Sequence, residues 1–289
     1  IGLILPMTGP FASSVGRQID ASIKTFIAQN GDTVAGKKIE IILKDDASTA
    51  DTTKRLAQEL VVNDKVHILA GFGLTPLALA AAPVAREGKV PQIVMAAATS
   101  MVTEQSPFIV RTSFAATQPM PPLADWAFKN NIKKAMSLVA DFAPGHDIEK
   151  GFEEFFTKAG GAVTEKVRVP LRSPDFAPFL QRVADQKPDA LFVFVPAGIG
   201  AQFMKQYVER GMDKSGIKLI ATGDLTDDDL LNGMGDVALG IVNSHHYSAH
   251  HQSPENKAYV EGFAKVTHGG RPNFMRVGRY DGMRAIYEA

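Results

Sequence analysis

The segment Val66–Pro76, VHILAGFGLTP, passes from a short apolar run into a glycine-containing turn and the start of a helix. Val66–Ala70 has the nearly continuous apolar character expected of a strand that is covered on both faces. Thr75 is a residue type favoured as a helix N-cap, and Pro76 then stands at the first helical position, where its missing N–H costs nothing. The segment predicts a strand, a tight turn and a helix, the repeating unit of a parallel α/β sheet.

The same alternation of short apolar runs with helix-spaced apolar residues recurs along the 289 residues. The other expected strands are Ile1–Leu5, Lys38–Lys44, Gln92–Met95, Ala135–Ala140, Val163–Val169, Ala190–Val195, Ile217–Ala221 and Val237–Val242. Between them the apolar residues repeat at helical spacing. This order predicts parallel sheets with helices on both faces.

The run Thr117–Pro122, TQPMPP, separates two such series, because three prolines in six residues fit neither a central strand nor a helix interior. The helical material after Tyr247 has no strand partners of its own and is expected to return to the first series. We therefore predict two doubly wound Rossmann-like lobes, residues 1–118 with 249–289 and residues 119–248. A further C-terminal stretch is expected, because the sequence stops inside a helical pattern.

Composition excludes several classes of protein. Lys plus Arg equals Asp plus Glu at 31 each, which removes the basic footprint of a nucleic-acid binder. The absence of cysteine excludes disulfide scaffolds, Cys-ligated metal sites and thiol nucleophiles. No run approaches the ~18–20 apolar residues of a membrane span. The sequence opens without Met and without a signal segment, so we expect a processed N-terminus.

Motifs of catalysis are also missing. Gly71-Phe72-Gly73 is not a dinucleotide fingerprint, because Pro76 stands at the position of the third glycine. Gly198-Ile199-Gly200 fails in the same way at Phe203, and there is no P-loop or G-x-S-x-G motif. The cluster His245, His246, His250 and His251 lacks the spacing of metal ligands and is interpreted as surface histidines. We expect no enzyme activity, no metal and no cofactor.

The candidate binding residues lie in the loops that follow the expected strands, because open parallel sheets bind ligands beyond their carboxyl ends. In the first half these loops are small and polar, with Ser14, Thr75 and the segment Ala96–Ser100. A capped helix or a tight turn is the alternative interpretation of each. In the second half the corresponding loops contain His146 and Asp224, while Thr226 is a candidate cap of the next helix.

The segments IGLILPMTGPFASSVG, GFGLTP, VMAAATS, GDLTDDDLL, GIVNSHHY and VGRYDGM follow one another over nearly the whole chain. In this order and spacing the chain resembles the periplasmic branched-chain amino-acid (Leu/Ile/Val) binding proteins of ABC transporters. The resemblance implies a type I solute-binding fold, whose two lobes close on a ligand in the cleft between them. It further implies a periplasmic location after removal of a signal peptide, an ABC permease as partner and a monomeric state.

Carried over by position, the family's carboxylate-binding residues fall on Thr75, Ala97 and Thr99. The acidic residue that meets the amino group of an amino acid falls on Asp224. For a ligand with an aromatic ring or a phenol, we expect His146 and Tyr280 to face it.

Two departures from the family pattern alter the wall of the expected site. Ser13-Ser14 replace an aromatic residue, and Pro196-Ala197-Gly198 stand where the family has a tyrosine. Branched-chain or related amino acids and aromatic acids therefore both stay open as ligands. The leading hypothesis is a solute-binding protein that captures a small hydrophobic carboxylate by lobe closure. The alternatives are a ligand-sensing domain of the same fold that binds amides or other small molecules, and a nucleotide-dependent enzyme, which the failed glycine motifs oppose.

Overall fold

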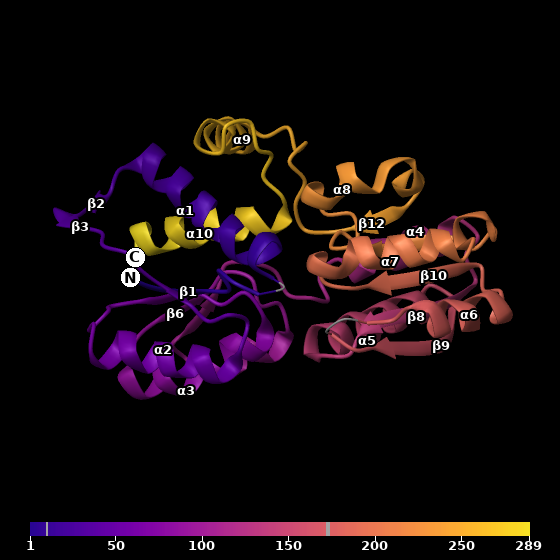
Figure 1. The fold of residues 1–289 in the computed structure, drawn as a ribbon, viewed down its shortest axis with the longest axis horizontal. Coiled ribbons are helices and arrows are strands. Elements are labelled where there is room, and N and C mark those ends of the chain that lie inside the picture. Colours follow the sequence, from indigo (N-terminus) through magenta and orange to yellow (C-terminus); the bar gives the residue numbers. More distant parts are fainter. Residues whose placement is uncertain (10, 172–173) are drawn as a thin grey trace. The chain divides into compact units, whose positions relative to one another are not determined.

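Two separate parallel sheets organise this computed structural model, which describes residues 1–9, 11–171 and 174–289, without the side chains of residues 13, 14, 18, 198 and 232. The chain forms two compact units, which we call unit 1 (Ile1–Ala115 with Tyr247–Ala289) and unit 2 (Ala116–His246). Each unit contains one of the two sheets, with helices on both of its faces (Figure 1). The predicted fold class, two doubly wound α/β lobes, is confirmed.

In unit 1 the parallel strand order is β4-β1-β5-β6-β7. Its strands are β1 (Gly2–Leu5), β4 (Ile42–Asp45), β5 (Leu69–Gly71), β6 (Gln92–Val94) and β7 (Ile109–Arg111), with a small hairpin of β2 (Thr33–Val34) and β3 (Lys37–Lys38). Its helices are α1 (Arg17–Asn30), α2 (Ala50–Val62), α3 (Thr75–Gly88), α9 (Pro254–Val266) and α10 (Phe274–Glu288), with short turns η1 (Ala12–Gly16) and η2 (Ser100–Glu104).

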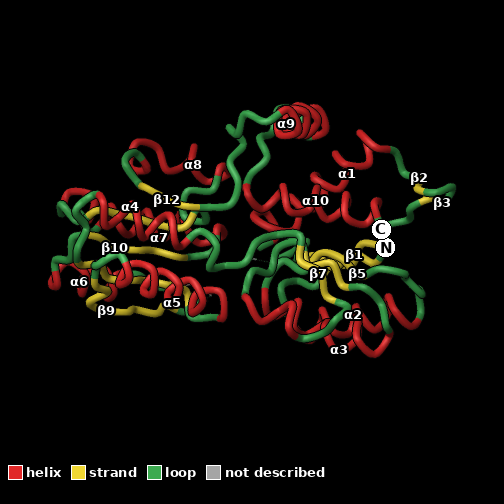
Figure 2. The backbone as a smooth tube through the Cα atoms, turned by 180° about the vertical axis from the view of Figure 1, so that it is seen from behind, coloured by secondary structure: helices red, strands yellow, loops and turns green. Residues whose placement is uncertain are grey.

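Helices α2 and α3 cover one face of this sheet, and α1 and α10 cover the other (Figures 1 and 2). The close approach of α10 depends on two glycines of the motif VGRYDGM. A Cβ at Gly278 would lie 3.0 Å from the Cα atom of Ser113, and one at Gly282 would lie 2.7 Å from the terminal methyl carbon of Met95. The C-terminal helix is thus bound to the strand ends of unit 1.

In unit 2 the parallel strand order is β12-β11-β10-β8-β9. Its strands are β8 (Lys134–Ala140), β9 (Ala162–Val169), β10 (Ala190–Phe194), β11 (Lys218–Thr222) and β12 (Val242–Ser244). Its helices are α4 (Met120–Lys129), α5 (Ala143–Lys158), α6 (Ala177–Gln186), α7 (Ala197–Glu209) and α8 (Asp228–Met234), with short turns η3 (Met212–Lys214) and η4 (Gly235–Ala238).

The side chains of the buried strand β10 pack alternately on the two faces of this sheet. Phe192 stacks on Phe152 of α5 with ring centroids 4.1 Å apart. Leu191 and Val193 pack in the opposite cluster, which includes Phe203 of α7. This two-sided burial is the reason that β10 reads as a continuous apolar run in the sequence.

The two sheets have the same topology when their strands are numbered in chain order, namely 2-1-3-4-5. In this arrangement the chain turns in opposite directions from the first and third strands, and the carboxyl ends of those two strands form the usual ligand-binding edge. The edge lies at the ends of β1 and β5 in unit 1 and at the ends of β8 and β10 in unit 2.

Some sequence expectations were wrong in detail. Most of Val237–Val242, expected as a strand, is turn and loop, and β12 begins only at Val242. Strand β7 was missed because Ile109–Arg111 is short and ends on a charged residue. Thr226 does not cap α8, since the cap is Asp227, whose side chain accepts a hydrogen bond from the N–H of Asp229. In the described part of the chain, no helix has the length and apolar character to cross a membrane.

Candidate functional site

In unit 1 the turn after β5 is held by unusual backbone geometry. Gly71 has a φ of 110°, and a Cβ there would lie 2.4 Å from the carbonyl oxygen of Ile4 in β1. Phe72 follows with a φ of 63°, a left-handed conformation that is rare for a bulky residue. The close passage of β5 along β1 thus requires glycine, and the turn leads directly to Thr75 at the ligand-binding edge.

Thr75 is the first residue of α3, and the N-cap is Leu74 rather than Thr75 as predicted. The side chain of Thr75 is therefore not used for capping. The residue is only 1% exposed, and its hydroxyl has no hydrogen-bond partner among the described residues. Burying an unsatisfied hydroxyl costs about 1–3 kcal/mol, so this group favours a ligand that would accept its hydrogen bond.

The neighbouring loop after β6 contains the two other predicted carboxylate-binding residues. The N–H of Ala97 donates to the carbonyl of Phe72 at 3.2 Å, so this N–H is occupied and Ala97 can offer its small side chain and its carbonyl. Thr99 is 1% exposed and precedes η2. Nη1 of Arg111 donates to the carbonyl of Thr99 at 2.6 Å and to that of Ala98 at 3.4 Å.

Arg111 is therefore the residue that fixes this loop, and the sequence reasoning missed it because the strand that carries it, β7, was missed. Its guanidinium donates to the loop carbonyls and adds a positive charge close to Thr99. Hydroxyl groups close to a cation that is held in place favour the binding of an anion.

The loop after β1 is fixed by Asp45 at the end of β4. Its carboxylate accepts hydrogen bonds from the N–H of Met7 at 2.9 Å and from the hydroxyl of Thr8 at 2.7 Å. Burial raises the pKa of Asp45, but the hydrogen bonds from Thr8, Ala47 and Met7 outweigh it and hold the pKa below its usual value. Ser14 lies further on in this loop, in η1, and its side chain is outside the described residues.

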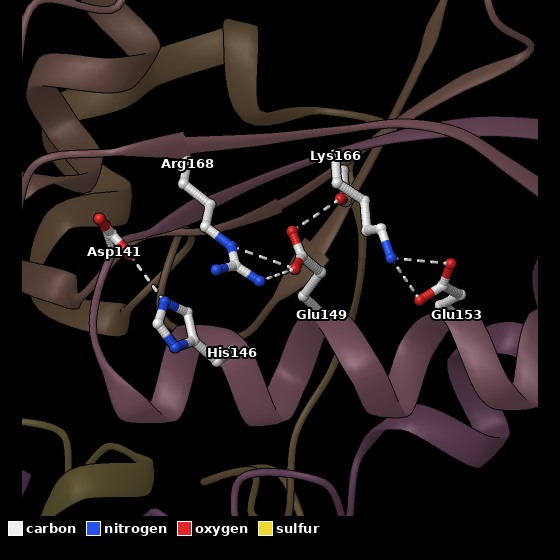
Figure 3. A network of polar contacts seen from close by, with 7 residues as sticks. Asp141, His146, Glu149, Glu153, Lys166 and Arg168 are labelled. Carbon is white, nitrogen blue, oxygen red and sulfur yellow. Dashed lines mark hydrogen bonds and ion pairs between the residues drawn. The ribbon is translucent and has the colours of Figure 1, made fainter.

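In unit 2 the corresponding edge contains a network of charged side chains (Figure 3). Asp141 follows β8, and its carboxylate lies 2.7 Å from Nε2 of His146 in the first turn of α5. Both side chains are about half exposed, at 55% and 42%. The structure thus brings the predicted residue His146 to the binding edge with its ring held by Asp141.

The remaining members of the network neutralise one another. Glu149 is buried, and its carboxylate accepts from Arg168 Nη2 at 2.7 Å and from the hydroxyl of Ser137 at 3.3 Å. The hydrogen bond to Glu149 is the largest cause of the raised pKa of Arg168. Lys166 and Glu153 form a second ion pair at 2.8 Å.

Two aromatic residues that the sequence reasoning did not select lie at the same edge. Phe142, half-buried, follows Asp141 directly, and its ring stacks on that of Phe194 at the end of β10, with centroids 5.9 Å apart and planes at 16°. The sequence could have indicated them, because Phe142 and Phe194 stand at the carboxyl ends of the first and third strands expected in the second half of the chain, Ala135–Ala140 and Ala190–Val195.

Asp224 is 7% exposed and already has partners within unit 2. Its carboxylate accepts from the hydroxyl of Thr222 at 2.9 Å and lies 3.4 Å from Nε2 of His245. His245 is thus a buried side chain, which corrects its interpretation as a surface histidine, whereas His246 and His250 are exposed. A ligand amine at Asp224 would compete with these internal contacts.

Tyr280 lies on α10 and is engaged in helix packing. Its hydroxyl donates to Oε1 of Gln29 at 2.7 Å, and its ring meets those of Phe26 and Tyr259 with centroids 5.1 and 4.6 Å away. The structure therefore gives Tyr280 a place among α1, α9 and α10, and not the ligand-facing role that we expected. Among the described residues, no group of three or more His, Cys, Asp or Glu side chains is arranged to hold a metal ion.

A family model described as "Periplasmic binding protein" matches residues 1–289 in full. The chain belongs to the periplasmic binding protein family. The predicted resemblance is confirmed, and family membership indicates ligand binding for transport, an extracytoplasmic place of action and an ABC transporter as partner system.

Particular members of the periplasmic binding protein family differ in the ligands named for them. A Leu/Ile/Val-binding protein homolog 6 of Brucella melitensis is 43% identical over 100% of this chain and 74% of its own length. A solute-binding protein of an ABC transporter from Rhodopseudomonas palustris BisB5, solved with 3,4-dihydroxybenzoic acid, is 61% identical with a TM-score of 0.95, over 99% of this chain and 78% of that one. Another from R. palustris, solved with 4-hydroxybenzoate, is 40% identical with a TM-score of 0.94, over the same shares.

Proposed function

We propose that this protein is the periplasmic binding component of an ABC importer and that its ligand is a small aromatic carboxylate of the hydroxybenzoate class. The observation that carries the proposal is the buried, unpartnered hydroxyl of Thr75 at the binding edge of unit 1. The ligands of the R. palustris relatives support the aromatic class over a branched-chain amino acid.

In this proposal each unit supplies part of the ligand contacts. The carboxylate binds at Thr75 and Thr99, beside the small side chain of Ala97 and close to Ser14. The aromatic ring meets Phe142 and His146. Asp224 stays with its internal partners and meets no ligand amine.

Ligand binding then shifts the population toward a closed arrangement of the two lobes, because a ligand held by both lobes binds that arrangement more tightly. We further propose that the protein acts as a monomer, with a signal peptide removed on export and an ABC permease as its partner.

Calorimetric titration with 4-hydroxybenzoate, 3,4-dihydroxybenzoate, benzoate and leucine tests the ligand class. We expect saturable binding of the aromatic acids and none of leucine. Small-angle scattering on the same samples should show a smaller radius of gyration with the bound acid. Tight binding of leucine without binding of any benzoate would overturn the aromatic assignment and favour a branched-chain amino-acid binder.

A further inference from the structure

We propose, on the basis of the proposed function, that the Asp141–His146 pair recognises the substituent on the ligand ring. Asp141 fixes Nδ1 of His146 as a hydrogen-bond acceptor, and the site thereby selects benzoates that carry a donor, such as a hydroxyl, over benzoates of similar size that lack one.

The direction of the hydrogen bond between the two residues sets the chemistry of the histidine. A carboxylate can only accept, so the Asp141 oxygen at 2.7 Å requires the proton on Nε2 of His146. In the neutral ring the other nitrogen, Nδ1, then carries a lone pair and can only accept. Figure 3 shows the Asp141 bond at one end of the network, with the second ring nitrogen on the side of the ring away from Asp141.

Arg168 is the cation of this network that interacts with Asp141. Arg168 of β9 interacts electrostatically with Asp141 while its guanidinium pairs with Glu149. Because Glu149 already pairs with Arg168, this cation does not replace His146 as the hydrogen-bond partner of Asp141. Asp147, the residue after His146 on α5, is a further acidic group close in the chain.

The same helix start supplies a surface for the ligand ring. The N–H of His146 donates to the carbonyl of Phe142 at 3.1 Å, an i to i+4 contact that places the two residues one helical turn apart on one side of α5. Phe142 in turn stacks on Phe194. An aromatic ring that packs against this pair presents its substituent to a neighbouring acceptor, Nδ1 of His146.

The proposal predicts that affinity depends on whether the ring substituent of the ligand can donate a hydrogen bond. 4-Hydroxybenzoate and 4-aminobenzoate offer a donor at the ring position opposite the carboxylate, whereas 4-fluorobenzoate has a similar size and offers none. We expect the wild-type protein to bind the two donors about five- to tenfold more tightly than 4-fluorobenzoate, the ratio typical of one neutral hydrogen bond.

Three variants test the assignment by calorimetry with these three benzoates. His146→Phe should reduce the donor preference to about onefold, because phenylalanine has an aromatic ring but no hydrogen-bond acceptor. Asp141→Asn should reduce the preference partially, because an amide can also donate to Nε2 and so permits either ring tautomer. The control Lys166→Met removes an ion pair of the same network that is not proposed to touch the ligand, and should leave the preference unchanged.

Asp141 is a positioning residue, and nitrogen-15 NMR of the His146 ring reads its effect without any ligand. The wild type should show the proton on Nε2, and Asp141→Asn should show a mixture of tautomers. Circular dichroism checks folding, and His146→Leu replaces His146→Phe if the latter does not fold, since leucine offers no hydrogen-bond acceptor and should also remove the preference.

Equal affinity of the wild type for 4-hydroxybenzoate and 4-fluorobenzoate, or an unchanged preference in His146→Phe, would overturn this inference while leaving the aromatic ligand class intact. Binding of none of the benzoates by a folded wild type would overturn the proposed function and this inference with it.

Discussion

The two units have the same strand order and differ in the chemistry of their binding edges. The edge of unit 1 is built from small residues and hydroxyls, with Thr75 and Thr99 buried and Arg111 bonded to the carbonyl of Thr99. The edge of unit 2 is aromatic and charged, with Phe142 on Phe194 and the Asp141–His146 pair. Topology sets where a doubly wound sheet binds, and the residues after the strands set what it binds.

This difference predicts the orientation of the proposed ligand in its site. A buried hydroxyl without a partner, that of Thr75, suits a carboxylate, and an aromatic pair beside a histidine acceptor suits a ring with a donor substituent. The following variants test whether unit 1 recognises the acid group and unit 2 the ring.

Thr75→Val should have the largest effect, weakening the binding of 4-hydroxybenzoate by about ten- to a hundredfold, the range of a hydrogen bond to a charged group. The free protein should be as stable as the wild type or more stable, because the change removes a buried hydroxyl that has no partner. Calorimetry and thermal unfolding measure the two effects.

The matched control for Thr75→Val is Thr25→Val. Thr25 is also fully buried in unit 1, but its hydroxyl donates to the carbonyl of Ala21 at 2.9 Å. This variant should leave affinity unchanged and lower stability by about 1 kcal/mol. Unchanged affinity in Thr75→Val would remove that hydroxyl from the carboxylate site.

Arg111→Met should weaken the binding of every benzoate by about tenfold, since it releases the carbonyls of Ala98 and Thr99 and removes a nearby positive charge. Titrations at several salt concentrations measure the change. Arg111→Lys keeps the charge and should recover part of the affinity. If Arg111→Met also removed the preference for benzoates with a donor substituent, this result would contradict the assignment of the acid group to unit 1 and of the ring to unit 2.

Tyr207→Phe should affect only the alkaline stability of unit 2. Burial raises the pKa of Tyr207 from 10.0 to about 12, and the negative charge of Asp213 adds to the shift. Between these values the unfolded chain releases the phenol proton and the folded chain keeps it, so the free energy of unfolding falls as the pH rises, by up to about 1.4 kcal/mol per pH unit. Denaturant unfolding followed from pH 9 to 12 should show a shallower decline in the variant, and an identical decline would contradict the assignment.

Asp224→Asn should have the smallest effect on benzoate binding, less than about threefold, because the proposed ligand has no amine for Asp224 to meet. If the protein instead binds leucine, the same variant should abolish that binding, because a buried ammonium without a partner is costly. Titration of the variant with both ligands decides between these outcomes.

Local sequence patterns were sufficient for the strands and helices that are long and apolar. The strand Ala190–Val195 and the order strand, turn and helix in Val66–Pro76 were predicted correctly because strands buried on both faces must be continuously apolar, although β5 begins only at Leu69 and Leu74 caps α3. The carboxyl ends of the expected strands Val66–Ala70 and Ala135–Ala140 also pointed to Thr75 and His146. The short strand β7 carries no such pattern, and Arg111 was missed with it.

The sequence by itself determined the fold class and the loops in which a ligand is sought, because burial periodicity and turn residues are local properties of the chain. Only the tertiary structure decided the state of each side chain in those loops. It left the hydroxyl of Thr75 without a partner, bound Asp224 to Thr222 and His245, and placed Tyr280 against Gln29. Hydrogen-bond partners far apart in the sequence meet only when the sheets and helices pack, and no local pattern records which polar groups are then satisfied.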